Sequence, residues 1–159
     1  YRCPDGHGAR PVALCLERHD FMPAMLGRGL DVQDESFVIG VTMGAARDMT
    51  AEHTETFIRV STQEYPDPWR FTENHIMSYR LGIGFAKEHL AAADLHLIPF
   101  EGPEWQTRLL GDIRKHFGLV KEEMRAYYRS EEMYTPGTRA TRRLDTCKNR
   151  LDHDITSDG

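Results

Sequence analysis

A long helical repeat of apolar residues is the feature that most restricts how this chain can fold. It spans residues 68–97, and its apolar positions recur at intervals of three and four: Ile76, Tyr79, Ile83, Ala86, Leu90, Ala93 and Leu97. Arg80, Lys87 and Asp94 mark the opposite face, as in an amphipathic helix. Pro68 suits the first turn of such a helix. The pattern predicts one long central helix that buries a single face.

A second helical pattern precedes this one. Phe37, Val41 and Ala45 recur every four residues, which is typical of one helix face. Asp34 stands where an N-cap is expected, and Glu35 follows in the first turn, where a carboxylate favours the helix dipole. We therefore expect a helix beginning near Asp34.

The remaining segments complete an expected all-α fold. Residues 103–118 predict a helix begun by Pro103 and ended by Gly118, with a buried stripe formed by Trp105, Leu109, Ile113 and Phe117. Residues 56–62 are rich in β-formers and stay ambiguous between strand and helix, and residues 121–134 extend the helical part. We expect a single compact helical domain over 1–135 and a charged, weakly ordered tail over 136–159.

Composition excludes several classes of protein. With a net charge of -5 over 159 residues, no basic face for nucleic acid is expected. Cys3, Cys15 and Cys147 form no CxxC pair, which argues against a zinc ribbon or a disulfide framework and favours reduced thiols in an intracellular protein. No apolar run approaches the roughly 20 residues of a membrane span.

Residues 19–35 contain the strongest candidate for a chemical site. His19 and position 23 are one helical turn apart and would face the same way, with Asp20 beside them. A turn at Gly27 and Gly29 would fold the chain back, so that Glu35 enters from the next helix. An imidazole with carboxylates suits a borderline or hard divalent cation.

The same residues also have a purely structural interpretation. Asp20 would N-cap a helix beginning at Phe21, and Pro23 would fall in its tolerant first turn. His19 would then be an ordinary surface residue and Glu35 a helix-start carboxylate. The pattern by itself leaves both interpretations open.

The stretch resembles the ubiquinone (coenzyme Q) biosynthesis proteins of the fourth Coq type. Their signature is His-Asp-x-x-His followed by eleven residues and Glu; His19, Asp20 and Glu35 match it with the same spacing. The likeness covers roughly residues 12–119. The departure is Pro23, which stands where the family has its second histidine and offers neither a ligand atom nor a backbone N–H.

The resemblance implies a metal-dependent enzyme. In it His19, Asp20 and Glu35 would be both metal ligands and catalytic residues, with zinc or magnesium as the cofactor. Asp31, Gln33 or Asp34 could contribute an oxygen, and a histidine from elsewhere in the chain could replace the missing imidazole. The implied reaction is oxidative decarboxylation at ring carbon C1 of a polyprenylated aromatic precursor. The alternative implied by the family is a non-catalytic scaffold that presents prenylated lipids to other quinone-biosynthesis enzymes.

Two pairs of glycines are relevant to where a prenyl lipid could bind. Gly40 with Gly44, and Gly82 with Gly84, leave apolar grooves that fit an isoprenoid tail lying between helices, and they fit tight helix packing equally well. The family's substrate class favours the lipid interpretation. The resemblance also implies a peripheral protein of the bacterial cytoplasm or of the matrix side of the mitochondrial inner membrane. A homodimer is a further expectation.

Overall fold

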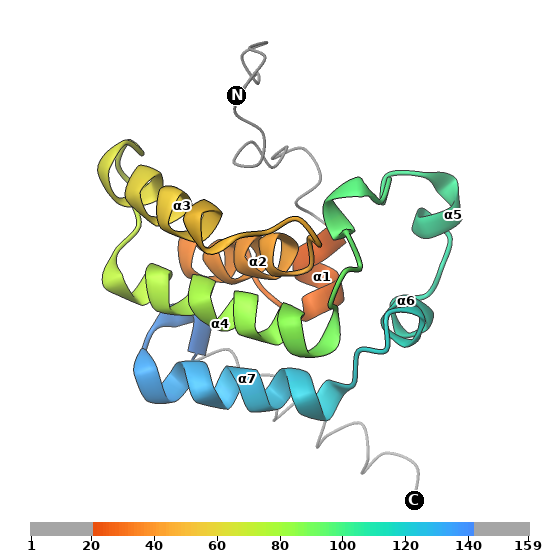
Figure 1. The fold of residues 1–159 in the computed structure, drawn as a ribbon. Coiled ribbons are helices and arrows are strands. Elements are labelled where there is room, and N and C mark those ends of the chain that lie inside the picture. Colours follow the sequence, from red (N-terminus) through yellow and green to blue (C-terminus); the bar gives the residue numbers. More distant parts are fainter. Residues whose placement is uncertain (1–20, 142–159) are drawn as a thin grey trace, which may run out of the picture.

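The computed structural model describes residues 21–141, and this part of the chain is all helical, without a strand. The elements follow in the order α1 (Phe21–Leu26), α2 (Val32–Gly44), α3 (Ala51–Gln63), α4 (Glu73–His89), the 3₁₀ turn η2 (Leu95–Leu97), α5 (Pro103–Gln106), α6 (Leu110–His116) and α7 (Lys121–Tyr134). In Figure 1, α4 lies between α2 and α7, and the short helices α5 and α6 gather at one end. The predicted all-α fold is confirmed.

The close crossing of α2 and α4 sets this arrangement. A Cβ added to Gly40 would lie 2.1 Å from the carbonyl oxygen of Tyr79, and one added to Gly82 would lie 2.2 Å from that of Phe37. At Gly44 the added atom would lie 2.9 Å from the Cα of Ile83. These three glycines let the two backbones touch, so their grooves are filled by the facing helix. The packing interpretation holds for them, and no open groove for a lipid tail remains there.

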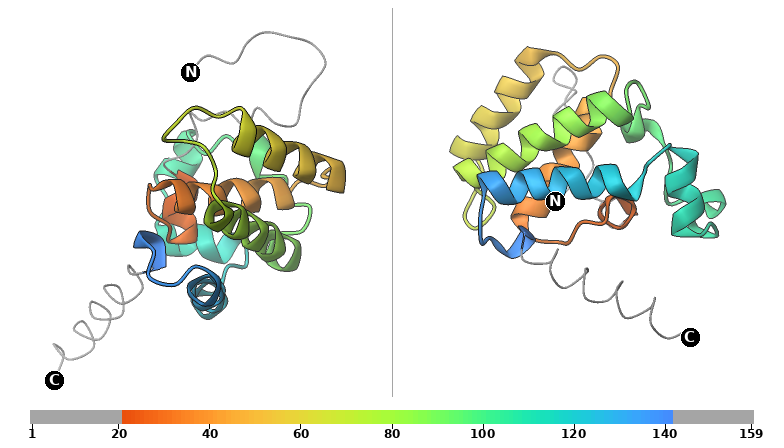
Figure 2. Two further views of the ribbon diagram at one scale, coloured as in Figure 1. Left: turned by 90° about the vertical axis from the view of Figure 1, so that its left-hand side faces the viewer. Right: turned by 90° about the horizontal axis from the view of Figure 1, so that it is seen from below.

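Two apolar clusters build on the crossing. The larger one joins α1, α2, α4, η2 and the α6–α7 region through Met25, Phe37, Phe85, Leu95 and Ile113, among others. The smaller one places Phe57 of α3 against Met43, Phe71, Tyr79 and Ile83. The two further views show α3 and α7 on different sides of the α2–α4 pair (Figure 2).

The end of α1 is fixed by a Schellman motif. Gly27 adopts the left-handed region with φ +70°, and the N–H groups of Arg28 and Gly27 donate to the carbonyls of Pro23 and Ala24 over 2.7 and 3.2 Å. This is the usual way to satisfy the last carbonyls of a helix. It turns the chain from α1 into α2, as the sequence predicted for Gly27.

Three predicted helix boundaries differ from the structure. The long helix begins at Glu73 instead of Pro68 and ends at His89, so Leu97 falls in η2 and is 68% exposed. The helix expected over 103–118 is broken into α5 and α6. Leu109, at the break, is 75% exposed, and Trp105 is partly buried beside the larger cluster. Tertiary packing determines which of these side chains are buried, and a periodic sequence pattern contains no information about tertiary packing.

Further boundaries also shift. Residues 56–62, which the sequence left ambiguous between strand and helix, lie inside α3. Phe57 and Ser61 are buried on one face of this helix. Asp31, not Asp34, caps α2 by accepting a hydrogen bond from the Asp34 N–H over 3.1 Å. Ala140 and Thr141 are buried, so the chain stays packed beyond the expected boundary at residue 135.

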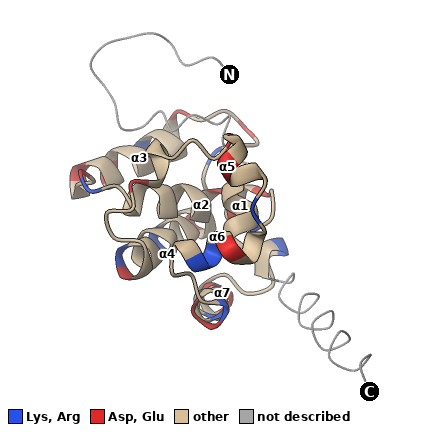
Figure 3. Cartoon of the chain, turned by 90° about the vertical axis from the view of Figure 1, so that its right-hand side faces the viewer, with Lys and Arg blue, Asp and Glu red and all other residues tan. Residues whose placement is uncertain are grey.

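The described surface carries both signs of charge. Lysine and arginine are interspersed with aspartate and glutamate on α3, α4 and α7 (Figure 3). Within residues 21–141, the apolar stretches of the helices are too short to cross a membrane.

The glycine crossing gives a matched pair of substitutions. Gly82→Ala should lower the free energy of unfolding by about 3 kcal/mol, since its Cβ meets a backbone carbonyl that cannot easily withdraw. Gly84→Ala should raise it by up to about 1 kcal/mol through helix propensity, because its Cβ would lie 3.9 Å from the Tyr127 hydroxyl. Urea unfolding of both variants measures this. Equal effects at the two positions would contradict the crossing.

Candidate functional site

Two of the four signature positions, 23 and 35, lie on the first two helices. Pro23 is in the first turn of α1 and is fully buried, and Glu35 is in the first turn of α2, partly exposed. Both placements match the structural interpretation, in which a helix begins at Phe21 with Pro23 in its first turn and Glu35 is a helix-start carboxylate. His19 and Asp20 lie outside the described residues. Their convergence with Glu35 on a metal therefore stays a prediction.

The three residues considered as extra oxygen donors have other partners. Asp31 caps α2, Gln33 donates to α7, and Asp34 faces Arg28. Between Phe21 and Thr141, no three histidine, cysteine or acidic side chains gather closely enough to hold a metal ion. A complete ligand set would thus need residues from outside this range.

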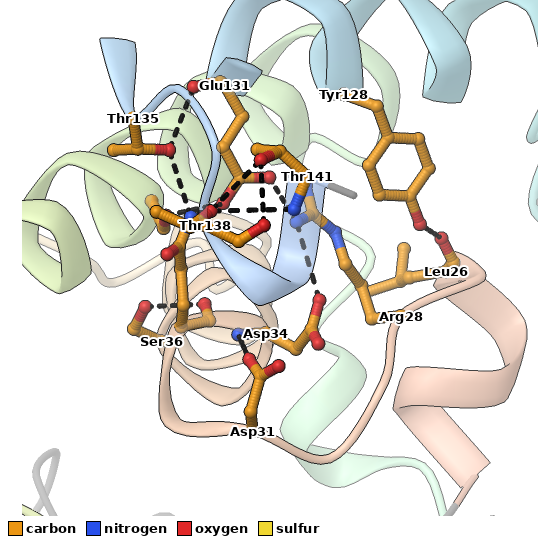
Figure 4. A network of polar contacts seen from close by, with 12 residues as sticks. Leu26, Arg28, Asp31, Asp34, Ser36, Tyr128, Glu131, Thr135, Thr138 and Thr141 are labelled. Carbon is orange, nitrogen blue, oxygen red and sulfur yellow. Dashed lines mark hydrogen bonds and ion pairs between the residues drawn. The ribbon is translucent and has the colours of Figure 1, made fainter. Parts of the chain in front are cut away.

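A buried carboxylate, Glu131, is the centre of a polar network that the sequence did not predict (Figure 4). Its side chain is 1% exposed. One carboxylate oxygen accepts from Arg28, and the other accepts from Ser78 and, over 3.0 Å, from the Gln33 amide. The same amide donates to the Thr135 hydroxyl over 3.0 Å. One carboxylate thereby ties α7 to α2, α4 and the α1–α2 loop.

Arg28 is the cationic partner and is equally buried, with 1% of its side chain exposed. Its Nη1 contacts Glu131 and lies 3.7 Å from the carboxylate of Asp34. Its Cζ lies 3.6 Å from the ring centroid of Phe37 and 4.2 Å from that of Tyr128. Such desolvated cation–π contacts stabilise a buried guanidinium. The Schellman turn at Gly27 places the residue for all of these contacts.

Side chains from α6 and α7 also hold the end of α1. Arg114 donates to the carbonyls of Met25 and Ala24 over 2.8 and 2.9 Å, and the Tyr128 hydroxyl donates to that of Leu26 over 2.7 Å. Burial raises the pKa of Tyr128 to about 12. The ordinary pKa of tyrosine is near 10. The neutral Tyr128 hydroxyl therefore contributes its full stabilisation below about pH 10, and this contribution is lost as the pH rises towards 12.

One sequence signal could have revealed the network. Met124, Tyr127, Tyr128 and Glu131 recur at helical spacing on α7, which places a glutamate on the apolar stripe of an otherwise charged helix. Acidic residues are almost never fully buried unless they are paired. The partner, Arg28, lies 103 residues away in sequence. No local pattern joins the two.

The network predicts strongly coupled substitutions. Arg28→Met should destabilise the protein by about 3–5 kcal/mol, because it leaves Glu131 buried without its cation. The double variant Arg28→Met with Glu131→Gln should lose clearly less free energy of unfolding than the sum of the losses in the two single variants. Chemical denaturation of the four proteins measures the coupling.

The exposed pair Arg59–Glu64, with an N–O distance of 3.0 Å, supplies the control. Arg59→Met should change stability by less than about 1 kcal/mol. Additive effects for Arg28 and Glu131 would show that these side chains do not depend on each other.

Comparison of the chain with protein-family models, with curated proteins and with solved structures finds no match.

Proposed function

We propose that this chain is a ubiquinone-biosynthesis protein that binds polyprenylated aromatic precursors. The observation that carries the proposal is the spacing of His19, Asp20 and Glu35 in the sequence. Glu35 lies in the first turn of α2. α1 and α2 pack against each other, and the turn at Gly27 joins them. Contact between α1 and α2 supports the proposal that residues before α1 and residues at the start of α2 serve one ligand.

Within that function, the non-catalytic role of presenting prenylated intermediates to partner enzymes is favoured. The second histidine of the family signature is replaced by Pro23, whose ring has no donor atom and is enclosed in the core. A weakened ligand set reduces what a cation could contribute, whereas binding of a prenyl chain requires no metal.

The tail would bind on the surface, because the glycine crossing is filled. Several large apolar side chains are exposed near η2 and the α5–α7 region: Leu97, Leu109, Leu110 and Val120. Exposed apolar side chains are common singly, so a shared surface formed by these four residues is part of the proposal. A peripheral association with the bacterial inner surface or the mitochondrial matrix face belongs to the same proposal.

Binding of a prenylated phenol tests the proposal. A phenol with four isoprene units and no carboxylate should raise the free energy of unfolding by about 2.7 kcal/mol at a hundredfold excess over Kd. The same phenol without its tail is the control and should have no comparable effect. Thermal unfolding measures both, and mass spectrometry of the extracted lipid identifies any molecule that copurifies. Equal shifts with both phenols would contradict a prenyl-binding role.

Metal-assisted C1 oxidative decarboxylation is the second candidate function, and Glu35 is the observation that favours it. A carboxylate in the first turn of α2 stands where the resemblance requires the fourth ligand. A divalent cation, zinc or magnesium, would supply stabilisation of negative charge on the substrate. The donors between residues 21 and 141 do not by themselves form that site, so we derive no reaction step.

A zinc titration separates the two candidates. If Glu35 is a ligand together with His19 and Asp20, Glu35→Gln should weaken zinc binding by roughly tenfold, since a charged oxygen donor is lost. Glu52→Gln is the matched control, because Glu52 lies in the first turn of α3. Calorimetry on the native chain and both variants measures the affinities. Identical zinc affinities of the native chain and both variants would mean that Glu35 is a helix-start carboxylate and not a metal ligand.

A further inference from the structure

Two helices of this protein begin with a histidine where a capping glutamate is usual. In a capping box, a Glu or Gln three residues after the N-cap accepts a hydrogen bond from the N-cap N–H. Here the Thr50 N–H donates to Nδ1 of His53 over 3.3 Å, and the Thr72 N–H donates to Nδ1 of His75 over 3.1 Å. The start of α3 and the start of α4 therefore depend on the same kind of bond.

Both hydrogen bonds require a neutral imidazole. A backbone N–H can only donate, so Nδ1 must carry no proton. A protonated imidazole donates from both nitrogens, and its charge is unfavourable at the positive end of a helix dipole. A capping glutamate would remain an acceptor down to about pH 4, whereas histidine ordinarily titrates near about pH 6.5. His53 and His75 are the two histidines between residues 45 and 75, so mild acid acts on both caps.

The surroundings of His75 favour its neutral form. Burial lowers the pKa of His75, and the Asp31 carboxylate at the start of α2 and the backbone of Arg70 oppose this effect more weakly. Because the pKa lies below the ordinary value of about 6.5, the cap contributes its full stabilisation above about pH 6.5. This contribution is lost as the pH falls further.

The other charged links of α3 and its preceding loop do not titrate in mild acid. His53 is partly exposed and forms no ion pair with another residue between 21 and 141. On the α4 side, Arg80 Nη2 lies 4.0 Å from Glu55 Oε1 of α3, and in the loop before α3 Arg47 Nε lies 2.8 Å from Asp94 Oδ2. Guanidinium and carboxylate groups of this kind keep their charges between about pH 7 and pH 5.

Few side chains attach α3 to the rest of the fold. Phe57 and Ser61 are its buried residues. The Phe57 ring stacks on that of Tyr79, with centroids 4.8 Å apart, and meets the edge of Phe71 at 5.6 Å. The Phe71 N–H donates to the Ser61 carbonyl over 2.9 Å, and the Phe71 ring also contacts His75, with centroids 5.6 Å apart. Phe71 thus connects the end of α3 to the histidine cap of α4.

We propose that α3 is a cover that opens when the protein is acidified. Neutral His53 holds the start of α3, and neutral His75 holds the start of α4 together with Phe71. Protonation of both histidines releases these bonds, so that Phe57 leaves the smaller apolar cluster and exposes it. The α2–α4 crossing stays intact, because it depends on glycine contacts that carry no charge. Neither a metal nor a lipid takes part, so this pH response is independent of the proposed function.

The α4–α7 contact contains a histidine with the opposite response. Nδ1 of His89 lies 3.2 Å from Oε2 of Glu123 on α7, and its Nε2 lies 3.7 Å from Oε2 of Glu88. Protonation gives this imidazole a donor and a positive charge between two carboxylates, so acid does not weaken the contact. Since α3 and α7 lie on different sides of the α2–α4 pair (Figure 2), acid should loosen one side of the molecule only.

Amide hydrogen exchange of the full chain at about pH 7.5 and about pH 5 tests the inference, since the histidines change charge between these values. Rates are expressed as protection factors, which remove the intrinsic pH dependence of exchange. Protection of the α3 amides should fall by roughly tenfold at the lower pH, because two caps are lost. Protection of the α7 amides should not fall.

Glutamine variants identify the groups responsible. Glutamine is a regular capping-box residue that accepts the same hydrogen bond without titrating, so the double variant His53→Gln with His75→Gln should keep α3 protected at both pH values. His89→Gln is the control and should leave the α3 response as it is in the native chain. Unchanged α3 protection in the native chain, equal losses in α3 and α7, or a response that persists in the double variant would overturn the proposal. The native chain alone decides the first two outcomes, so the test does not depend on the folding of a variant.

Discussion

Contact between the backbones of α2 and α4 is the constraint on which the rest of the structure depends. At Gly40 and Gly82 any side chain would strike a carbonyl oxygen of the opposite helix. This short separation brings Phe37 and Phe85 together, with ring centroids 6.0 Å apart. Both apolar clusters then form on the flanks of the pair. A wider crossing would separate these side chains and expose both clusters.

The attachment of α7 follows a different physical principle. Its face towards α2 and α4 includes Glu131, which is fully enclosed and accepts three side-chain hydrogen bonds. Removing two charges from water is expensive, so such a pair stabilises little in total but is costly to break. Its geometric demands fix the position of α7. The same helix anchors α1 through Tyr128.

The motif and the network are connected by this anchoring. α1 has only six residues, too few for a stable helix in isolation. Its last carbonyls are held by Arg114 and Tyr128, so the position of Pro23 depends on α6 and α7. Loss of the network would therefore disturb Pro23, whose carbonyl also accepts from the Arg28 N–H over 2.7 Å.

By itself the sequence determined the helical character of the chain, the turn at Gly27 and the place of Glu35 at a helix start, because periodicity, capping and glycine conformation are local properties. It left the glycines open between a lipid groove and packing, and it placed Leu97 and Leu109 in buried stripes. Only the tertiary structure decided these points. Exposure depends on the element that covers a face, and the ion pair of Arg28 with Glu131 joins residues 103 positions apart, a pairing that exists only once the helices have packed.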